Sequence, residues 1–93
     1  MREEFKDVYK NFAEKYGLHS QIQQCIEEMG ELIKELCKYE RYINSDKIES
    51  IESSVKEEIA EVLNMVEQLE FCFGETEIEK IRTELLMGFV SPS

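Results

Sequence analysis

A chain of 93 residues with 21 acidic and 11 basic side chains carries a formal net charge of −10, which argues against general binding to the phosphate backbone of nucleic acids. It contains no run of 18 or more apolar residues, so the sequence predicts no membrane span. The charged stretch MREEFKDVYK at its start is unlike the apolar part of a secretory signal. We therefore expect a cytoplasmic protein with residues 1–93 in one domain.

Four helical segments follow one another along the chain, and strand-type alternation is missing. The first covers about residues 3–16 and stops at Gly17, and the second runs from about 20 to 42. The third starts between 46 and 50 and ends at Gly74, and the fourth runs from 76 to near 88, leaving a frayed tail at 88–93. This order predicts an all-α fold, a four-helix up-down arrangement with a long central antiparallel hairpin joined by INSDK.

Apolar spacing predicts which faces of the helices are buried. We expect the face of the first segment that includes Tyr9 and Tyr16 to pack in the core. The fourth segment is expected to direct its apolar residues inward, namely Ile78, Ile81 and Leu85. The three cysteines, Cys25, Cys37 and Cys72, are odd in number and far apart in sequence, which favours reduced, buried packing thiols. Because a core this small is marginal, we also expect pairing with further copies of the chain.

One glutamate interrupts an apolar seam on the third segment. The seam steps by four and three residues in strict alternation, as buried helical seams do, through Ile51, Val55, Glu58, Val62, Met65, Leu69 and Cys72. A carboxylate at position 58 therefore lies where an apolar side chain would stabilise the fold.

Three further glutamates lie where the hairpin can bring them near Glu58. Glu61 lies at the edge of the same apolar arc, and Glu28 and Glu31 share one flank of the second segment. Carboxylates gathered in an apolar setting repel one another unless a cation neutralises them. The lack of a nearby histidine argues against zinc, and hard oxygen ligands suit Mg²⁺ or Mn²⁺. Two structural alternatives stay open: solvated surface glutamates, and a seam glutamate that sets helix pairing.

The stretches SQIQQCIEEMGELIKEL and EEIAEVLNMVEQL resemble the MazG-like, all-α nucleoside triphosphate pyrophosphohydrolases. The signature of that family is Glu-Glu-x-x-Glu followed, after a variable spacer, by Glu-x-x-Asp. Glu27, Glu28 and Glu31 match its first part, and Glu58 matches the glutamate of its second part. Glu61 takes the place of the family's aspartate, which keeps a carboxylate but lengthens it by one methylene. The resemblance covers about residues 16–73.

The resemblance implies a helical subunit that works as a homodimer or homotetramer and cleaves a nucleoside triphosphate into a monophosphate and pyrophosphate. It implies Mg²⁺ as the cofactor, with Mn²⁺ as a substitute, held by Glu28, Glu31, Glu58 and Glu61. In this interpretation Glu27 is the catalytic, water-positioning carboxylate, and the substrate-binding residues are Gln21, Gln24 and Lys34. The two glutamines are donors to phosphate or base, and stacking on a base is the alternative to core packing for Tyr16. The alternative is a non-catalytic dimerisation or nucleotide-sensing module of the same fold, because the exchange at Glu61 and a C-terminal segment with few basic residues depart from the family pattern.

Overall fold

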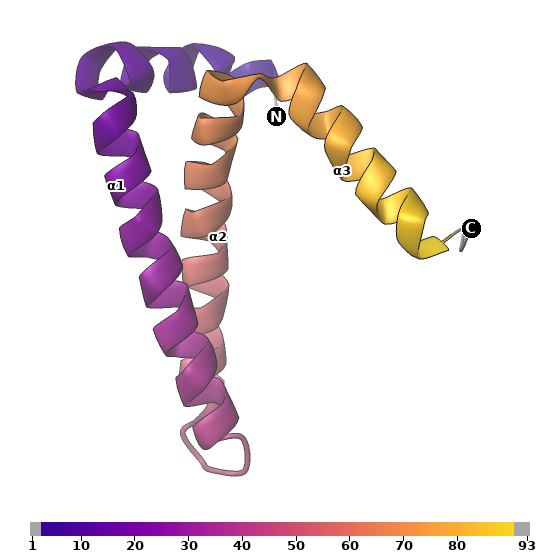
Figure 1. The fold of residues 1–93 in the computed structure, drawn as a ribbon. Coiled ribbons are helices and arrows are strands. Elements are labelled where there is room, and N and C mark those ends of the chain that lie inside the picture. The colour runs from indigo at the N-terminus through magenta and orange to yellow at the C-terminus, as the bar shows by residue number, and fades with distance from the viewer. Residues whose placement is uncertain (1–2, 91–93) are drawn as a thin grey trace.

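The computed structural model describes residues 3–90, and every element in that range is a helix (Figure 1). A short 3₁₀ helix, η1 (Glu3–Phe5), leads into α1 (Lys6–Arg41), which is followed by α2 (Ile48–Phe73) and α3 (Glu75–Val90). The predicted all-α class is therefore confirmed. None of the helices described is both long and apolar enough to cross a membrane.

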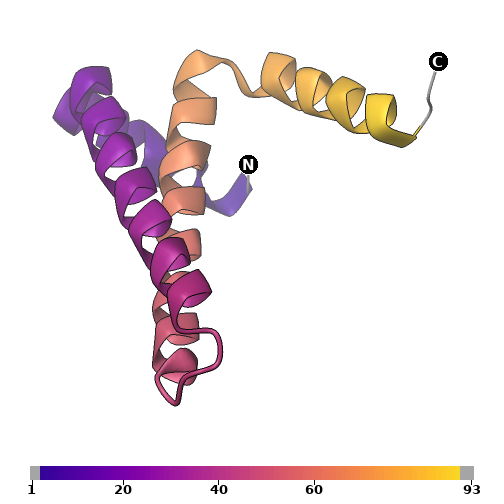
Figure 2. The same cartoon turned by 60° about the horizontal axis from the view of Figure 1, so that its bottom comes forward.

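Helix α1 consists of two helical segments that meet at Gly17. This glycine has a φ of 78° and a ψ of 157°, a backbone conformation that side-chain-bearing residues rarely adopt. The chain bends there, so the first segment crosses the end of the hairpin where α1 and α2 diverge (Figures 1 and 2). Tyr9 is buried, and its hydroxyl donates a hydrogen bond to Glu67 of α2. The first segment is thereby attached to α2.

The second part of α1 and all of α2 form the predicted antiparallel hairpin (Figure 1). The loop at 42–47 is closed by a bond from the amide of Ser45 to the carbonyl of Tyr42 at 3.0 Å and by one from the amide of Lys47 to the hydroxyl of Ser45 at 2.9 Å. Every rung of the α2 seam, including Glu58, is partly buried. The heptad pattern thus identified the face of α2 that meets α1.

Helix α3 leaves the hairpin and extends away from it (Figures 1 and 2). The turn lies at Gly74, whose φ is 113°. Ile81 and Leu85 are more than half exposed, so the predicted inward face of this segment is wrong for a single chain. The up-down arrangement holds only for the central pair of helices, because the flanking segments do not lie along it. The helix continues to Val90, and the rest of the predicted tail lies outside the described residues.

The single chain has little core of its own. Its radius of gyration is 16.3 Å, whereas a compact chain of this length has about 12 Å. Its accessible surface is 7292 Å², compared with roughly 5,600 Å² for a folded monomer of this mass. Among the side chains described, Tyr9 and Cys25 are the buried apolar ones. Cys37 is exposed, which corrects the expectation that all three thiols are buried.

Candidate functional site

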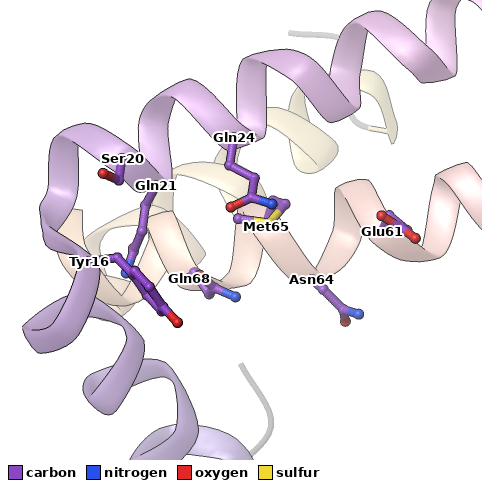
Figure 3. Close-up of a pocket in the computed structure, with 8 residues that line it drawn as sticks. All are labelled: Tyr16, Ser20, Gln21, Gln24, Glu61, Asn64, Met65 and Gln68. Atoms are coloured by element: carbon purple, nitrogen blue, oxygen red, sulfur yellow. The ribbon is translucent and has the colours of Figure 1, made fainter.

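A pocket of about 590 Å³ lies between the diverging ends of α1 and α2 (Figure 3). Side-chain amides form most of its polar wall, together with the hydroxyl of Ser20, one carboxylate, one phenol ring and one thioether. The lining residues are Tyr16, Ser20, Gln21, Gln24, Glu61, Asn64, Met65 and Gln68. Its volume is in the range typical of small-molecule sites.

Helical spacing places the polar side chains of each helix on the flank that faces the pocket. Gln21 and Gln24 are three residues apart on α1, and Glu61, Asn64 and Gln68 are separated by three and four residues on α2. Because the helices are antiparallel, the amides of both helices meet near Gly17, and the acids follow toward the loop. Sequence reasoning identified Gln21 and Gln24 but missed Asn64 and Gln68. Asn64 and Gln68 follow Glu61 by three and seven residues, and Gln24 and Gln21 precede Glu28 by four and seven residues. This similar spacing is the sequence feature that could have identified them.

Gln21 is held deep in the wall of this pocket. Its side chain is 3% exposed, and its Oε1 accepts a hydrogen bond from the thiol of Cys72, with an S···O distance of 3.4 Å. Its Nε2 is buried and has no hydrogen-bond partner. The thiol therefore occupies the acceptor end of the amide and leaves the donor end unsatisfied, which is an unfavourable state for a buried N–H group. Gln68 is the second buried amide of the wall.

Tyr16 lies at the rim of the pocket and not in the core. Its ring is half exposed and lines the pocket beside Gln21 and Gln68 (Figure 3). The ammonium of Lys15 lies 5.2 Å from the centroid of this ring. The expectation that Tyr16 packs in the core is wrong. Tyr16 is the last residue before the bend at Gly17, so it does not share the buried environment of Tyr9.

Two of the predicted carboxylates meet across the hairpin. The side chains of Glu61 and Glu28 lie within hydrogen-bonding reach, and this contact, the negative charge of Glu28 and some loss of solvation raise the pKa of Glu61. A proton shared by two acids reduces the repulsion between them, and a cation at the same position would reduce it in the same way. Glu58 is partly buried, and its Oε2 has no hydrogen-bond partner. Both observations fit a hard divalent cation, whose preferred ligands are carboxylate oxygens.

The remaining predicted residues lie outside this contact. Glu27, Glu31 and Lys34 are exposed on α1, and none of them lines the pocket. Across the side chains that the structure describes, no three His, Cys, Asp or Glu residues are grouped so that they would hold a metal ion. The four-carboxylate magnesium site stays a prediction, in which Glu28 and Glu61 are the pair that a single chain brings together.

The chain was compared with models of known protein families, with curated proteins and with solved structures, and none of the three comparisons finds a match.

Proposed function

We propose that this protein is a Mg²⁺-dependent nucleotide pyrophosphohydrolase that converts a nucleoside triphosphate into a monophosphate and pyrophosphate. The observation that carries the proposal is the acid pair of Glu28 and Glu61 at one end of a pocket whose other polar walls are mostly amides. The resemblance of the two glutamate motifs to those of the MazG-like enzymes supports the same assignment.

The acids and amides have separate tasks in this proposal. Glu28, Glu31, Glu58 and Glu61 hold the cation, which supplies charge neutralisation for the triphosphate and activation of the attacking water. Glu27 orients that water through its carboxylate. Gln21 and Gln24 bind the substrate by hydrogen bonds. Lys34, exposed on the same helix, contributes positive charge for the phosphates.

The direct test is a screen for pyrophosphate release over the common and modified nucleoside triphosphates with Mg²⁺ present. The expected result is release with at least one substrate and its loss in Glu28→Gln, because that substitution removes a charged ligand and keeps the size of the side chain. Glu57→Gln is the matched control, since Glu57 is exposed on α2 and lies outside the pocket. The absence of release with every substrate, or equal activity of both variants, contradicts the proposal.

The proposed enzyme works as a homodimer or homotetramer. The accessible surface of the single chain exceeds that of a compact monomer by about 1,700 Å², and a standard interface buries about 800 Å² on each partner. Much of the excess is apolar and lies on α2 and α3, where Leu63, Phe73, Leu85 and Leu86 are exposed. A second copy of the chain would cover this surface.

The same surface favours a second candidate function, a non-catalytic helical pairing or nucleotide-sensing module. In that case the glutamates set the choice of partner helix and bind no metal. Pyrophosphate release separates the two candidates, because a module forms the same oligomer but leaves triphosphates intact. A sensor would bind a triphosphate without cleaving it.

A further inference from the structure

We infer that the pocket between α1 and α2 binds the nucleobase of the substrate, with its amides as the groups that recognise the base edge and Tyr16 as a stacking surface. This inference rests on the proposed function and adds the orientation of the nucleotide. The base enters the amide-lined end of the pocket near Gly17, and the phosphates lie toward the acids.

The charge of the wall decides which part of a nucleotide this pocket takes. The lining residues contribute four side-chain amides and two hydroxyls, and the single carboxylate among them is that of Glu61. None of the lining side chains is cationic. The ammonium of Lys15 lies over the ring of Tyr16 at the rim, and the proposed cation at Glu61 lies at the opposite end, so a phosphate among the amides would lack a counter-charge. A neutral heterocycle meets no such penalty, and amide side chains match its pattern of donors and acceptors.

The unsatisfied donor of Gln21 indicates what the ligand must bring. Because Oε1 already accepts from Cys72, the amide offers its N–H groups and needs an acceptor. Carbonyl oxygens and ring nitrogens of nucleobases are such acceptors. The half-exposed ring of Tyr16 and the thioether of Met65 supply apolar contacts for the faces of a planar ring (Figure 3). Cys72 acts here as a positioning residue, since it does not line the pocket.

The distance along the helices suits one nucleoside. Gln21 precedes Glu28 by seven residues on α1, and Gln68 follows Glu61 by seven residues on α2. At 1.5 Å per residue each interval is about 10 Å. Both helices therefore place the innermost amides about the same distance from the acid pair, which leaves room for a ribose between a base near Gln21 and phosphates near Glu28.

The test uses the full chain with adenosine, guanosine, cytidine and uridine, without phosphate and without Mg²⁺, and measures binding by NMR titration. At least one nucleoside is expected to bind, whereas ribose alone does not. Gln24→Leu is expected to weaken the binding of that nucleoside about tenfold, which is the effect of one lost hydrogen bond at the upper end of the usual range. Gln24 is exposed, so this substitution leaves the fold intact. Gln23→Leu, at an exposed glutamine outside the pocket, is the matched control and should bind as the wild type does.

Substitution of Cys72 tests the positioning of Gln21. Cys72→Ala removes the hydrogen-bond donor to Oε1 of Gln21 and is expected to weaken nucleoside binding. Cys72→Ser keeps a donor and is expected to restore binding. Failure of every nucleoside to bind, equal binding of ribose, or an equal loss in Gln23→Leu overturns the base pocket. Nucleoside binding without pyrophosphate release overturns the hydrolase and leaves the pocket standing. Hydrolysis of all triphosphates at one rate, unchanged by Gln24→Leu, overturns the base pocket and leaves the hydrolase standing.

Discussion

Replacement of Glu58 by leucine is expected to stabilise the metal-free protein and to remove its response to Mg²⁺. The Oε2 atom of Glu58 is buried and has no hydrogen-bond partner, and an unsatisfied buried polar group costs about 1–3 kcal/mol. Leucine removes that atom and places an apolar side chain on a seam whose other rungs are apolar. At the lower end of the range, the melting temperature of a chain of this length rises by about 4–8 °C.

Magnesium should also stabilise the wild type, because it binds the carboxylates of the folded state. At a Mg²⁺ concentration 100-fold above its dissociation constant, binding stabilises the folded state by about 2.7 kcal/mol, which raises the melting temperature by on the order of 10–20 °C. Glu58→Gln, which keeps the size but removes the charge, should lose this rise. Thermal unfolding followed by circular dichroism, with and without Mg²⁺, measures both effects.

The matched control is Glu57→Leu, at the exposed neighbouring position of the same helix turn. It should change the free energy of unfolding by no more than about 0.5 kcal/mol and should keep the full response to Mg²⁺. If metal-free Glu58→Leu is no more stable than the wild type, and Mg²⁺ stabilises both equally, Glu58 has no role in cation binding and the reasoning from its orphaned oxygen is wrong.

Three further predictions concern the parts of the chain around the hairpin. Tyr9→Phe removes the hydrogen bond to Glu67 and should lower the free energy of unfolding by about 1–2 kcal/mol in urea titrations, and an unchanged midpoint would show that this bond contributes nothing. Burial and a hydrogen bond to Glu79 raise the pKa of Glu70 above its ordinary value of 4.5, so the stability gained from its proton is present below that value and is lost as the pH rises through the folded pKa. Glu70→Gln, which keeps a donor, should flatten this pH dependence, and identical urea midpoints of the two proteins at every pH would contradict the assignment. Leu63→Glu puts a charge on the exposed apolar face of α2 and should convert the proposed oligomer to a monomer in light scattering, whereas an oligomer that this change leaves intact would place the interface elsewhere.

The sequence predicts the hairpin well because its signals are local. The alternating step of four and three residues identifies the partly buried face of α2, and Gly17 ends the first helical segment where the structure shows a positive φ. Neither inference depends on knowing what packs against the helix. The partial burial of Glu58 follows from the same pattern, since a rung of the seam faces the partner helix whatever its side chain.

Features that depend on tertiary context could not be obtained in this way. The apolar spacing of α3 predicts a buried face, but spacing alone does not tell whether the cover comes from the same chain or from another, and in the single chain Ile81 and Leu85 are exposed. Asn64 and Gln68 look like ordinary surface residues of a polar helix flank. Only the antiparallel arrangement brings them opposite Gln21 and Gln24, so the amide wall of the pocket becomes visible only in three dimensions.

The loop at 42–47 lies at the far end of the hairpin from the pocket. Gln68 is 20 residues beyond the start of α2 at Ile48, which at 1.5 Å per residue is about 30 Å along the helix. Since loop tips remote from a site tolerate insertions best, a fluorophore-bearing peptide or an affinity tag inserted after Asn44 should leave ligand binding unaltered. The loop thus offers a place to immobilise or label the protein while both chain ends stay untouched.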